Sequence, residues 1–204
     1  MTRWATLTIA LLFSAIGTFQ YAGTASGQAG GGWVTLFDGK NLDHWQGDGT
    51  ATFKIEEGSL IATDKKDPKA VAAYLVTKER YKDFTIRAEF WVSNDANSGI
   101  YFRCEDPKNI STKNCYEANI FDERKDPTYG TGALMYLAEV NPVPKVGGKW
   151  TTIEVTAKGR DLSLSLDGKK ITEARNGMLE KGGVIALQFG VGTIKFRKIE
   201  IKEL

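Results

Sequence analysis

The sequence contains very little histidine and cysteine, and this scarcity excludes several kinds of active site. Its 204 residues include one histidine, His44, and two cysteines. A single histidine excludes a metal site built from clustered histidines and leaves one base for a Ser–His–Asp triad. His44 lies in Asn41-Leu-Asp-His-Trp45, where we expect a turn. We therefore interpret it as a surface residue and not as a catalytic one.

An excess of charge of one sign is also lacking. The 27 lysines and arginines nearly balance the 25 aspartates and glutamates, giving a formal net charge of +2 with no basic patch. Nucleic acid and anionic membrane surfaces are therefore poor candidate partners. No glycine-rich phosphate loop stands between a strand and a helix, and Gly30-Gly-Gly32 is typical of a flexible link.

Long apolar runs are missing except near the N-terminus. Arg3 precedes an uncharged apolar run from Ala5 to Phe19, and small residues follow as far as Ala29. This pattern is typical of an export signal over residues 1–29. A membrane anchor is the alternative, but the run is diluted by threonines and shorter than the roughly 20 residues that span a bilayer. We predict a secreted or periplasmic protein with one domain, residues 30–204, and no stable membrane span.

The two cysteines lie close together, at Cys104 and Cys115. In an oxidising compartment such a pair predicts a disulfide that closes a polar loop. Two free or metal-binding thiols are the alternative, although this spacing matches neither a zinc motif nor C-x-x-C.

Helical periodicity is absent from residues 30–204, and alternation of apolar and polar residues takes its place. In residues 84–91, Phe84, Ile86, Ala88 and Phe90 share one face. Further strands are expected at residues 35–37, 53–56, 59–62, 73–77, 99–104, 115–121, 132–137, 150–157, 161–166, 169–172, 184–189 and 194–201. Short strands separated by turn residues predict an all-β fold, an antiparallel β-sandwich or jelly roll. Asp167-Gly168 predicts a hairpin turn, and a phase break near Arg197-Lys198 predicts a bulge.

A curved sheet offers a concave face to ligands, so strand faces that are both polar and aromatic are candidate binding sites. Four such faces are Tyr101 with Arg103, Glu117 with Asn119, Gln188, and Glu89 with Trp91. Aromatic rings beside planar polar groups are suited to sugar recognition, because C–H faces pack on rings and hydroxyls take hydrogen bonds. An ordinary solvated sheet face is the alternative. A two-carboxylate glycosidase site would need Glu89 and Glu117 on one face.

The order of motifs in the sequence resembles the 3-keto-disaccharide hydrolase family, within the concanavalin A-like lectin/glucanase superfamily. The resemblance covers residues 33–45 (WVTLFDGKNLDHW), 53–61, 81–89, 97–103 (NSGIYFR), Tyr116-Glu117, 131–133, Leu187-Gln188 and Phe196-Arg197. It implies a concanavalin A-like jelly roll that acts on sugars oxidised to a ketone at C3.

The resemblance also suggests roles for particular residues. A 3-keto group acidifies the C2 proton, so a base can remove it and expel the C1 substituent before water adds. We expect Glu117 to be the base, with Arg103, Asn119 and Gln188 holding the ketone or hydroxyls, and Glu89, Trp91 and Tyr101 contacting the sugar. A divalent metal held by carboxylates could replace the arginine, but the sequence shows no definite ligand set.

The chain departs from the family pattern at several polar positions. Trp91 stands where arginine is expected, Asn119 where glutamine is usual and Thr151 where asparagine is usual. The Leu187-Gln-Phe-Gly190 segment lacks the histidine often found soon after the Leu-Gln pair. A non-catalytic carbohydrate-binding module on the same scaffold is therefore the alternative to an enzyme, and an interaction domain without a sugar ligand is a third hypothesis.

Overall fold

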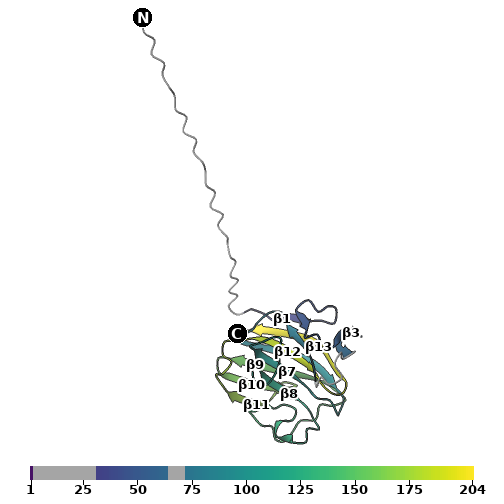
Figure 1. Cartoon of the computed structure of the whole chain (residues 1–204). Helices are drawn as coiled ribbons and strands as arrows, with labels where there is room; N and C mark the ends of the chain where they lie inside the picture. Colours follow the sequence, from purple (N-terminus) through teal and green to yellow (C-terminus); the bar gives the residue numbers. More distant parts are fainter. Residues whose placement is uncertain (2–30, 64–71) are drawn as a thin grey trace.

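The computed structural model describes Met1, residues 31–63 and residues 72–204, and these form two antiparallel sheets (Figure 1). The predicted export signal, apart from Met1, lies outside the described residues. Within the described residues, no helix is long and apolar enough to cross a membrane. The structure contains thirteen strands there and one short 3-10 helix, Pro127–Tyr129. The predicted all-β sandwich is confirmed.

The large sheet has eight strands among the described residues, in the order β11-β10-β9-β6-β13-β4-β3, and β1 also pairs with β13. These strands are β1 (Val34–Phe37), β3 (Thr52–Glu56), β4 (Ser59–Thr63), β6 (Phe84–Val92), β9 (Trp150–Lys158), β10 (Asp161–Leu166), β11 (Lys169–Arg175) and β13 (Ile194–Glu203).

The small sheet has five strands in the described part of the chain, in the order β2-β5-β12-β7-β8. They are β2 (Trp45–Gly47), β5 (Ala73–Thr77), β7 (Ser98–Cys104), β8 (Tyr116–Ile120) and β12 (Val184–Phe189). The core lies between the sheets, where alternate residues of β6, such as Phe84 and Phe90, meet Ile100, Phe102 and Leu187 of the small sheet. Burial of this apolar area is the main stabilising contribution to the fold.

Local sequence features explain the turns. The β10–β11 hairpin turns at Asp167 and Gly168, which both have positive φ, at 49° and 77°. The predicted bulge in β13 is also confirmed, because the register with β6 shifts between Arg197 and Glu200, and Lys198 has a φ of 48°. The strand predicted at residues 132–137 is wrong, since this segment forms only isolated bridges and turns. Its backbone still lies along β8, where the amide of Asn119 donates to the Ala133 carbonyl.

The predicted disulfide between Cys104 and Cys115 is confirmed. It joins the end of β7 to the residue before β8 and closes the loop at residues 105–114, which we call the disulfide loop. We expect replacement of both cysteines by serine to lower the free energy of unfolding by about 3 kcal/mol, because a loop of about a dozen residues is then no longer constrained in the unfolded state. Urea denaturation of the variant and of the reduced wild type measures this. Unchanged stability in both would contradict a stabilising role.

Candidate functional site

The outer face of the small sheet brings several predicted residues into two adjacent rows. Residues that pair across antiparallel strands point to the same face, so the strand registers define each row. The first row, from β2 to β8, is Gln46, Val76, Ala186, Tyr101 and Glu117. The second row, from β5 to β8, is Tyr74, Gln188, Gly99 and Asn119.

Gln188 lies at the centre of this arrangement. Its Nε2 is 3.4 Å from the hydroxyl oxygens of both Tyr74 and Tyr101, to which it donates. The two tyrosine rings meet edge to face, with centroids 5.4 Å apart. Oε1 of Gln188 is buried and has no hydrogen-bond partner within the described part of the chain. An unpaired buried acceptor is costly, and a ligand hydroxyl placed there would satisfy it.

Glu117 lies beside these groups, and its side chain passes over Gly99. A Cβ atom at residue 99 would lie 3.1 Å from Oε1 of Glu117, so the missing side chain of Gly99 leaves room for the carboxyl group. Glu117 is only 6% exposed. Burial raises its pKa to about 7, while a hydrogen bond from Tyr101 and the positive charge of Arg124 act in the opposite direction. A carboxyl group that titrates near neutrality can accept or release a proton at physiological pH.

The two tyrosines act as hydrogen-bond donors in this environment. Burial, together with the negative charge of Glu117, raises the pKa of both Tyr74 and Tyr101. Both hydroxyls therefore stay protonated across the physiological range. We call Tyr74, Tyr101, Glu117 and Gln188 the Glu117 cluster.

Asn119 shares the outer face with the Glu117 cluster, but its amide holds a neighbouring loop. Nδ2 of Asn119 donates to the carbonyl of Tyr129 at 2.5 Å, and the backbone carbonyl of Asn119 accepts from Gly132. The side chain is 2% exposed. It shares a face with Glu117, as predicted, and its observed side-chain contact is with the protein itself.

Arg103 does not lie on this face, so the prediction that it shares a face with Tyr101 is wrong. The register of β7 with β12 shifts between Tyr101 and Cys104, and Arg103 has a φ of 52°. The extra residue of the bulge turns the side chain away from the tyrosine. Its guanidinium, fully buried, donates to the carbonyls of Lys82 and Gly159 and to the carboxylate of Asp83.

Glu89 and Trp91 lie on the outer face of the large sheet, and the prediction that they join the other candidates is also wrong. Oε2 of Glu89 accepts from Nε of Arg197 at 2.8 Å, and Trp91 lies 5.6 Å from the ammonium of Lys195. Glu89 and Glu117 therefore point away from each other on opposite sides of two sheets that pack about 10 Å apart. This separation exceeds the roughly 5–9.5 Å of a two-carboxylate glycosidase site.

This placement predicts that Glu89→Gln and Trp91→Ala have little effect at the Glu117 cluster. We expect the apparent pKa of Glu117, followed by carbon NMR of its carboxyl group, to stay at its wild-type value in both variants. Loss of the Glu89–Arg197 pair should lower the free energy of unfolding by less than about 1 kcal/mol, because both partners are partly exposed. A clear change in the Glu117 titration would show that the two faces communicate.

Comparison with known proteins identifies the family. A family model described as the 3-keto-alpha-glucoside-1,2-lyase-like domain matches residues 32–202. The chain belongs to this family. No curated protein matches the chain.

Solved structures share the fold at low sequence identity. Two proteins of Parabacteroides distasonis, described as candidate glycosyl hydrolases, both give TM-scores of 0.71, at 19% and 24% identity. The matches cover 85% of this chain and 94% and 100% of theirs. A beta-glucanase of Bacillus licheniformis has a TM-score of 0.60 at 12% identity, with 87% of this chain and 99% of that one covered. The fold is thus the concanavalin A-like jelly roll that the sequence predicted.

Most of the departures from the family pattern lie away from the Glu117 cluster. Trp91 is on the other sheet, and Thr151 points inward from β9 with its hydroxyl unpartnered among the described residues. Phe189 is also buried, and its ring packs 5.3 Å from that of Phe53. Only Asn119 of these four lies beside Gln188 and Glu117. These departures therefore leave all four residues of the Glu117 cluster in place.

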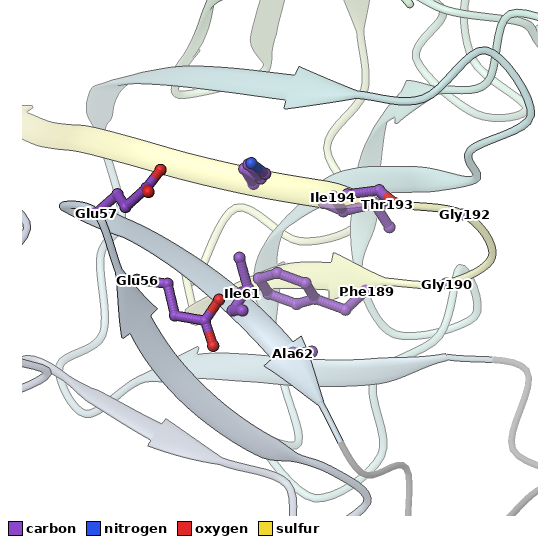
Figure 2. A pocket seen from close by; sticks show the side chains of 10 residues that line it. Glu56, Glu57, Ile61, Ala62, Phe189, Gly190, Gly192, Thr193 and Ile194 are labelled. Carbon is purple, nitrogen blue, oxygen red and sulfur yellow. The ribbon is translucent and has the colours of Figure 1, made fainter. Parts of the chain in front are cut away.

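A cavity of about 430 Å³ lies elsewhere, between β4 and β13 (Figure 2). These strands pair only where Phe196 meets Leu60, so they separate beyond that point. Ile61 and Phe189 both line the cavity, and the exposed side chains of Glu56 and Glu57 stand at its rim (Figure 2). No predicted site residue lines this cavity.

Sequence reasoning missed two residues of the site. Tyr74 lies in a strand that was predicted correctly, and its alternation with Leu75 could have placed it beside Gln188 once the strand order was known. Arg124 lies in a charged loop without periodicity, where no sequence signal points to Glu117. Within the described residues, no three His, Cys, Asp or Glu side chains are grouped so as to hold a metal ion.

Proposed function

We propose that this chain is a carbohydrate-active enzyme that cleaves 3-keto-glycosides by elimination, with Glu117 as the base. The observation that carries this proposal is the buried Glu117 carboxyl group, whose pKa is raised to about 7 beside two protonated tyrosines and Gln188. The family supports carbohydrate chemistry for the chain. The substrate and the assignment of the base are our inference.

The reaction begins when the carboxylate of Glu117 removes the proton from C2 of the sugar. The electron pair of the broken C–H bond passes into an enolate, whose charge rests on the C3 oxygen. As the enolate collapses, a C1=C2 double bond forms and the bond from C1 to the leaving oxygen breaks. That oxygen keeps the electron pair and takes the proton that Glu117 now carries, which restores the carboxylate. Addition of water to this double bond, with oxygen at C1 and a proton at C2, then completes a net hydrolysis.

The neighbouring residues supply what the enolate needs. The Tyr74 hydroxyl is a donor for the C3 oxygen or an adjacent hydroxyl, while Tyr101 donates to Glu117 and the Gln188 amide donates to both tyrosines. Donors held in place in a site that excludes water act more strongly than donors in water. The positive charge of Arg124 acts on Glu117, so we assign to Arg124 the role of the cation near the enolate, which the sequence had suggested for Arg103. The cluster contributes a single carboxylate, which is too few ligands for a divalent metal, so the steps use side chains alone.

A non-catalytic carbohydrate-binding module is the second candidate. The unpartnered Oε1 of Gln188 beside two tyrosine hydroxyls would suit sugar hydroxyls without any proton transfer. The fold is also shared with a carbohydrate-binding module, CBM66 of Bacillus subtilis, at 17% identity and a TM-score of 0.60 over 78% of this chain and 96% of that one.

A turnover assay separates the two candidates. The pure protein is incubated with 3-keto-trehalose and with methyl 3-keto-glucoside, and the released sugar or methanol is followed. We expect turnover, slowed when C2 carries deuterium because its C–H bond breaks in the reaction. Binding by calorimetry without turnover would support the binding module and would overturn the enzyme. We also propose that the protein acts in an oxidising compartment outside the cytoplasm, which its disulfide supports.

A further inference from the structure

A cavity of about 410 Å³ lies between the loop that precedes β9 and the ends of β9, β10 and β11. The loop contributes residues 140–146 and Lys149 to its lining. The strands and the β10–β11 turn contribute Thr151, Leu166, Asp167, Lys169, Lys170 and Ile171. The volume is within the range of small-ligand sites. No residue of the Glu117 cluster is in this lining, so the cavity is separate from the candidate active site.

Hydrogen bonds hold both walls of the cavity in place. On the loop side, Oδ2 of Asp122 accepts from the amides of Val146 and Gly147 at 2.8 and 2.9 Å. On the strand side, Oδ1 of Asp167 accepts from the Thr152 amide at 2.8 Å, which ties the β10–β11 turn to β9. Because both walls are already fixed, a ligand does not have to order either of them when it binds.

The lining of the cavity carries an excess of positive charge. Of the described residues that form it, four are lysines and one, Asp167, is acidic. The whole chain has a formal net charge of only +2, so this excess is a local feature. A hollow lined by charge of one sign attracts ligands of the opposite sign.

Most of these lysines have no acidic partner. Lys149 and Lys169 make no ion pair or hydrogen bond with another described residue. Lys145 donates to an uncharged backbone carbonyl, and Lys170 pairs with the carboxylate of Glu173. An anionic group in the cavity can therefore take charge-assisted hydrogen bonds from ammonium groups that are otherwise unpaired.

A buried hydroxyl group in the wall of the cavity also lacks a partner. Thr151 is 2% exposed, and its Oγ1 has no hydrogen-bond partner within the described part of the chain. An unpaired buried polar group is costly, and a polar group of a ligand placed against it would remove that cost. A hydroxyl both donates and accepts, so it suits a sugar hydroxyl.

The rest of the cavity surface is apolar. It is formed by Leu166 and Ile171 of the hairpin and by Pro142, Val143 and Pro144 of the loop. Apolar surface beside unpaired cations favours a ligand that has both an apolar face and a negative charge over a hydrated inorganic ion. An acidic sugar has the C–H face of its ring, a carboxylate or sulfate group, and hydroxyls.

We propose that this cavity binds an acidic sugar unit of a glycan. Its carboxylate or sulfate group lies at Lys149 and Lys169, its C–H face packs on Leu166 and Ile171, and one of its hydroxyls pairs with Thr151. The site does not depend on the chemistry proposed for Glu117. It gives the protein a second point of contact with carbohydrate, one that selects for negative charge.

Nitrogen NMR titrations with trigalacturonate and with a chondroitin sulfate tetrasaccharide test this site. We expect at least one of them to shift the amides of Val146, Thr151 and Lys169, and neutral maltotriose to leave these amides unchanged at the same concentration. Lys149→Ala and Lys169→Ala should each weaken binding by about ten-fold, the loss of one charge-assisted hydrogen bond. Lys181→Ala, at an exposed lysine outside the lining, is the matched control and should bind as the wild type does.

Thr151→Val tests the hydroxyl separately, because valine keeps the branched shape of the side chain. We expect the acidic oligosaccharide to bind about three-fold more weakly, since one hydrogen bond is lost. The free energy of unfolding should not fall, because the hydroxyl has no partner to lose among the described residues.

Several outcomes would overturn the proposal. These are the absence of a shift with both acidic oligosaccharides, equal shifts with maltotriose, or binding that is unchanged in both lysine variants. Sodium sulfate separates a sugar site from a simple ion site, and sulfate that binds as tightly as the oligosaccharides would overturn the sugar. The measurement uses amides of the cavity, so a failure to turn over 3-keto-glycosides leaves its result unaffected.

Discussion

Glu117→Gln is expected to lower kcat for a 3-keto-glycoside by about 10²–10⁴-fold, the range of a general base. The amide has nearly the shape of the carboxyl group, so it keeps the packing over Gly99 but cannot accept the C2 proton. Sugar binding, measured by calorimetry, should change much less than kcat. Glu139→Gln, at an exposed carboxylate, is the control and should retain wild-type turnover.

The same substitution should stabilise the protein at high pH. The pKa of Glu117 is about 7 in the folded protein, against 4.5 for an ordinary glutamate. Because the folded state holds this proton more tightly than the unfolded state, protonated Glu117 stabilises the fold. This stabilisation is complete below about pH 4.5 and is lost as the pH rises through about 7. A difference of this size corresponds to about 3 kcal/mol. The glutamine variant carries no charge at any pH, so its stability relative to wild type should rise by about 2.5 kcal/mol from about pH 5 to pH 8.

If both effects are observed, Glu117 is the base and its buried carboxylate lowers the stability of the protein at neutral pH. Urea denaturation of wild type and Glu117→Gln at each pH measures the second effect independently of any substrate. Turnover that survives in the variant would remove Glu117 as the base. A stability difference that does not change with pH would show that its carboxyl group is not held in a desolvated site.

Arg103→Met is expected to lower the free energy of unfolding by about 3–5 kcal/mol. The Arg103 guanidinium is fully buried and donates to two carbonyls and to the carboxylate of Asp83. Removing it takes this donor away from the two carbonyls and leaves Asp83 with the Gly159 amide but without its cation, which costs more than the loss of an exposed pair. Arg175→Met is the matched control, because its partner Asp161 is exposed and the loss should stay below about 1 kcal/mol.

This prediction also separates a structural arginine from one that binds substrate. If Arg103 has a structural role, Arg103→Met unfolds at a lower urea concentration than the wild type. Its substrate affinity is then unchanged under conditions in which the variant is folded. If Arg103→Met unfolded at the wild-type midpoint and raised KM alone, Arg103 would contact the sugar, and its position in the structure would have to change with the ligand.

The strand pattern could be predicted from the sequence because alternation is a local property. Residues 84–91 and 161–166 show it clearly, and both form strands within one residue of the predicted bounds. The same alternation placed Glu117 with Asn119, and the strand registers then brought Tyr101 and Gln188 beside them.

The errors arise where local patterning does not determine position. Alternation assigns a face within a strand but does not show which sheet the strand joins, so Glu89 and Trp91 were grouped with residues of the other sheet. The face of Arg103 was predicted wrongly because one extra residue in β7 makes its side chain point to the other side of the sheet. No glycine in the sequence marks this bulge. The position of Arg124 near Glu117 depends on the path of the long loop that follows β8, and no periodic pattern in the sequence predicts that path.

The pH dependence of kcat/KM for a 3-keto-glycoside tests the central claim most directly, because it reports the ionisation of the base in the free enzyme. If the carboxylate of Glu117 removes the C2 proton, kcat/KM rises with pH and reaches half of its plateau near pH 7. A profile that is flat from about pH 5.5 to 8.5, or one whose midpoint lies near the ordinary glutamate pKa of 4.5, would contradict a buried Glu117 as the base.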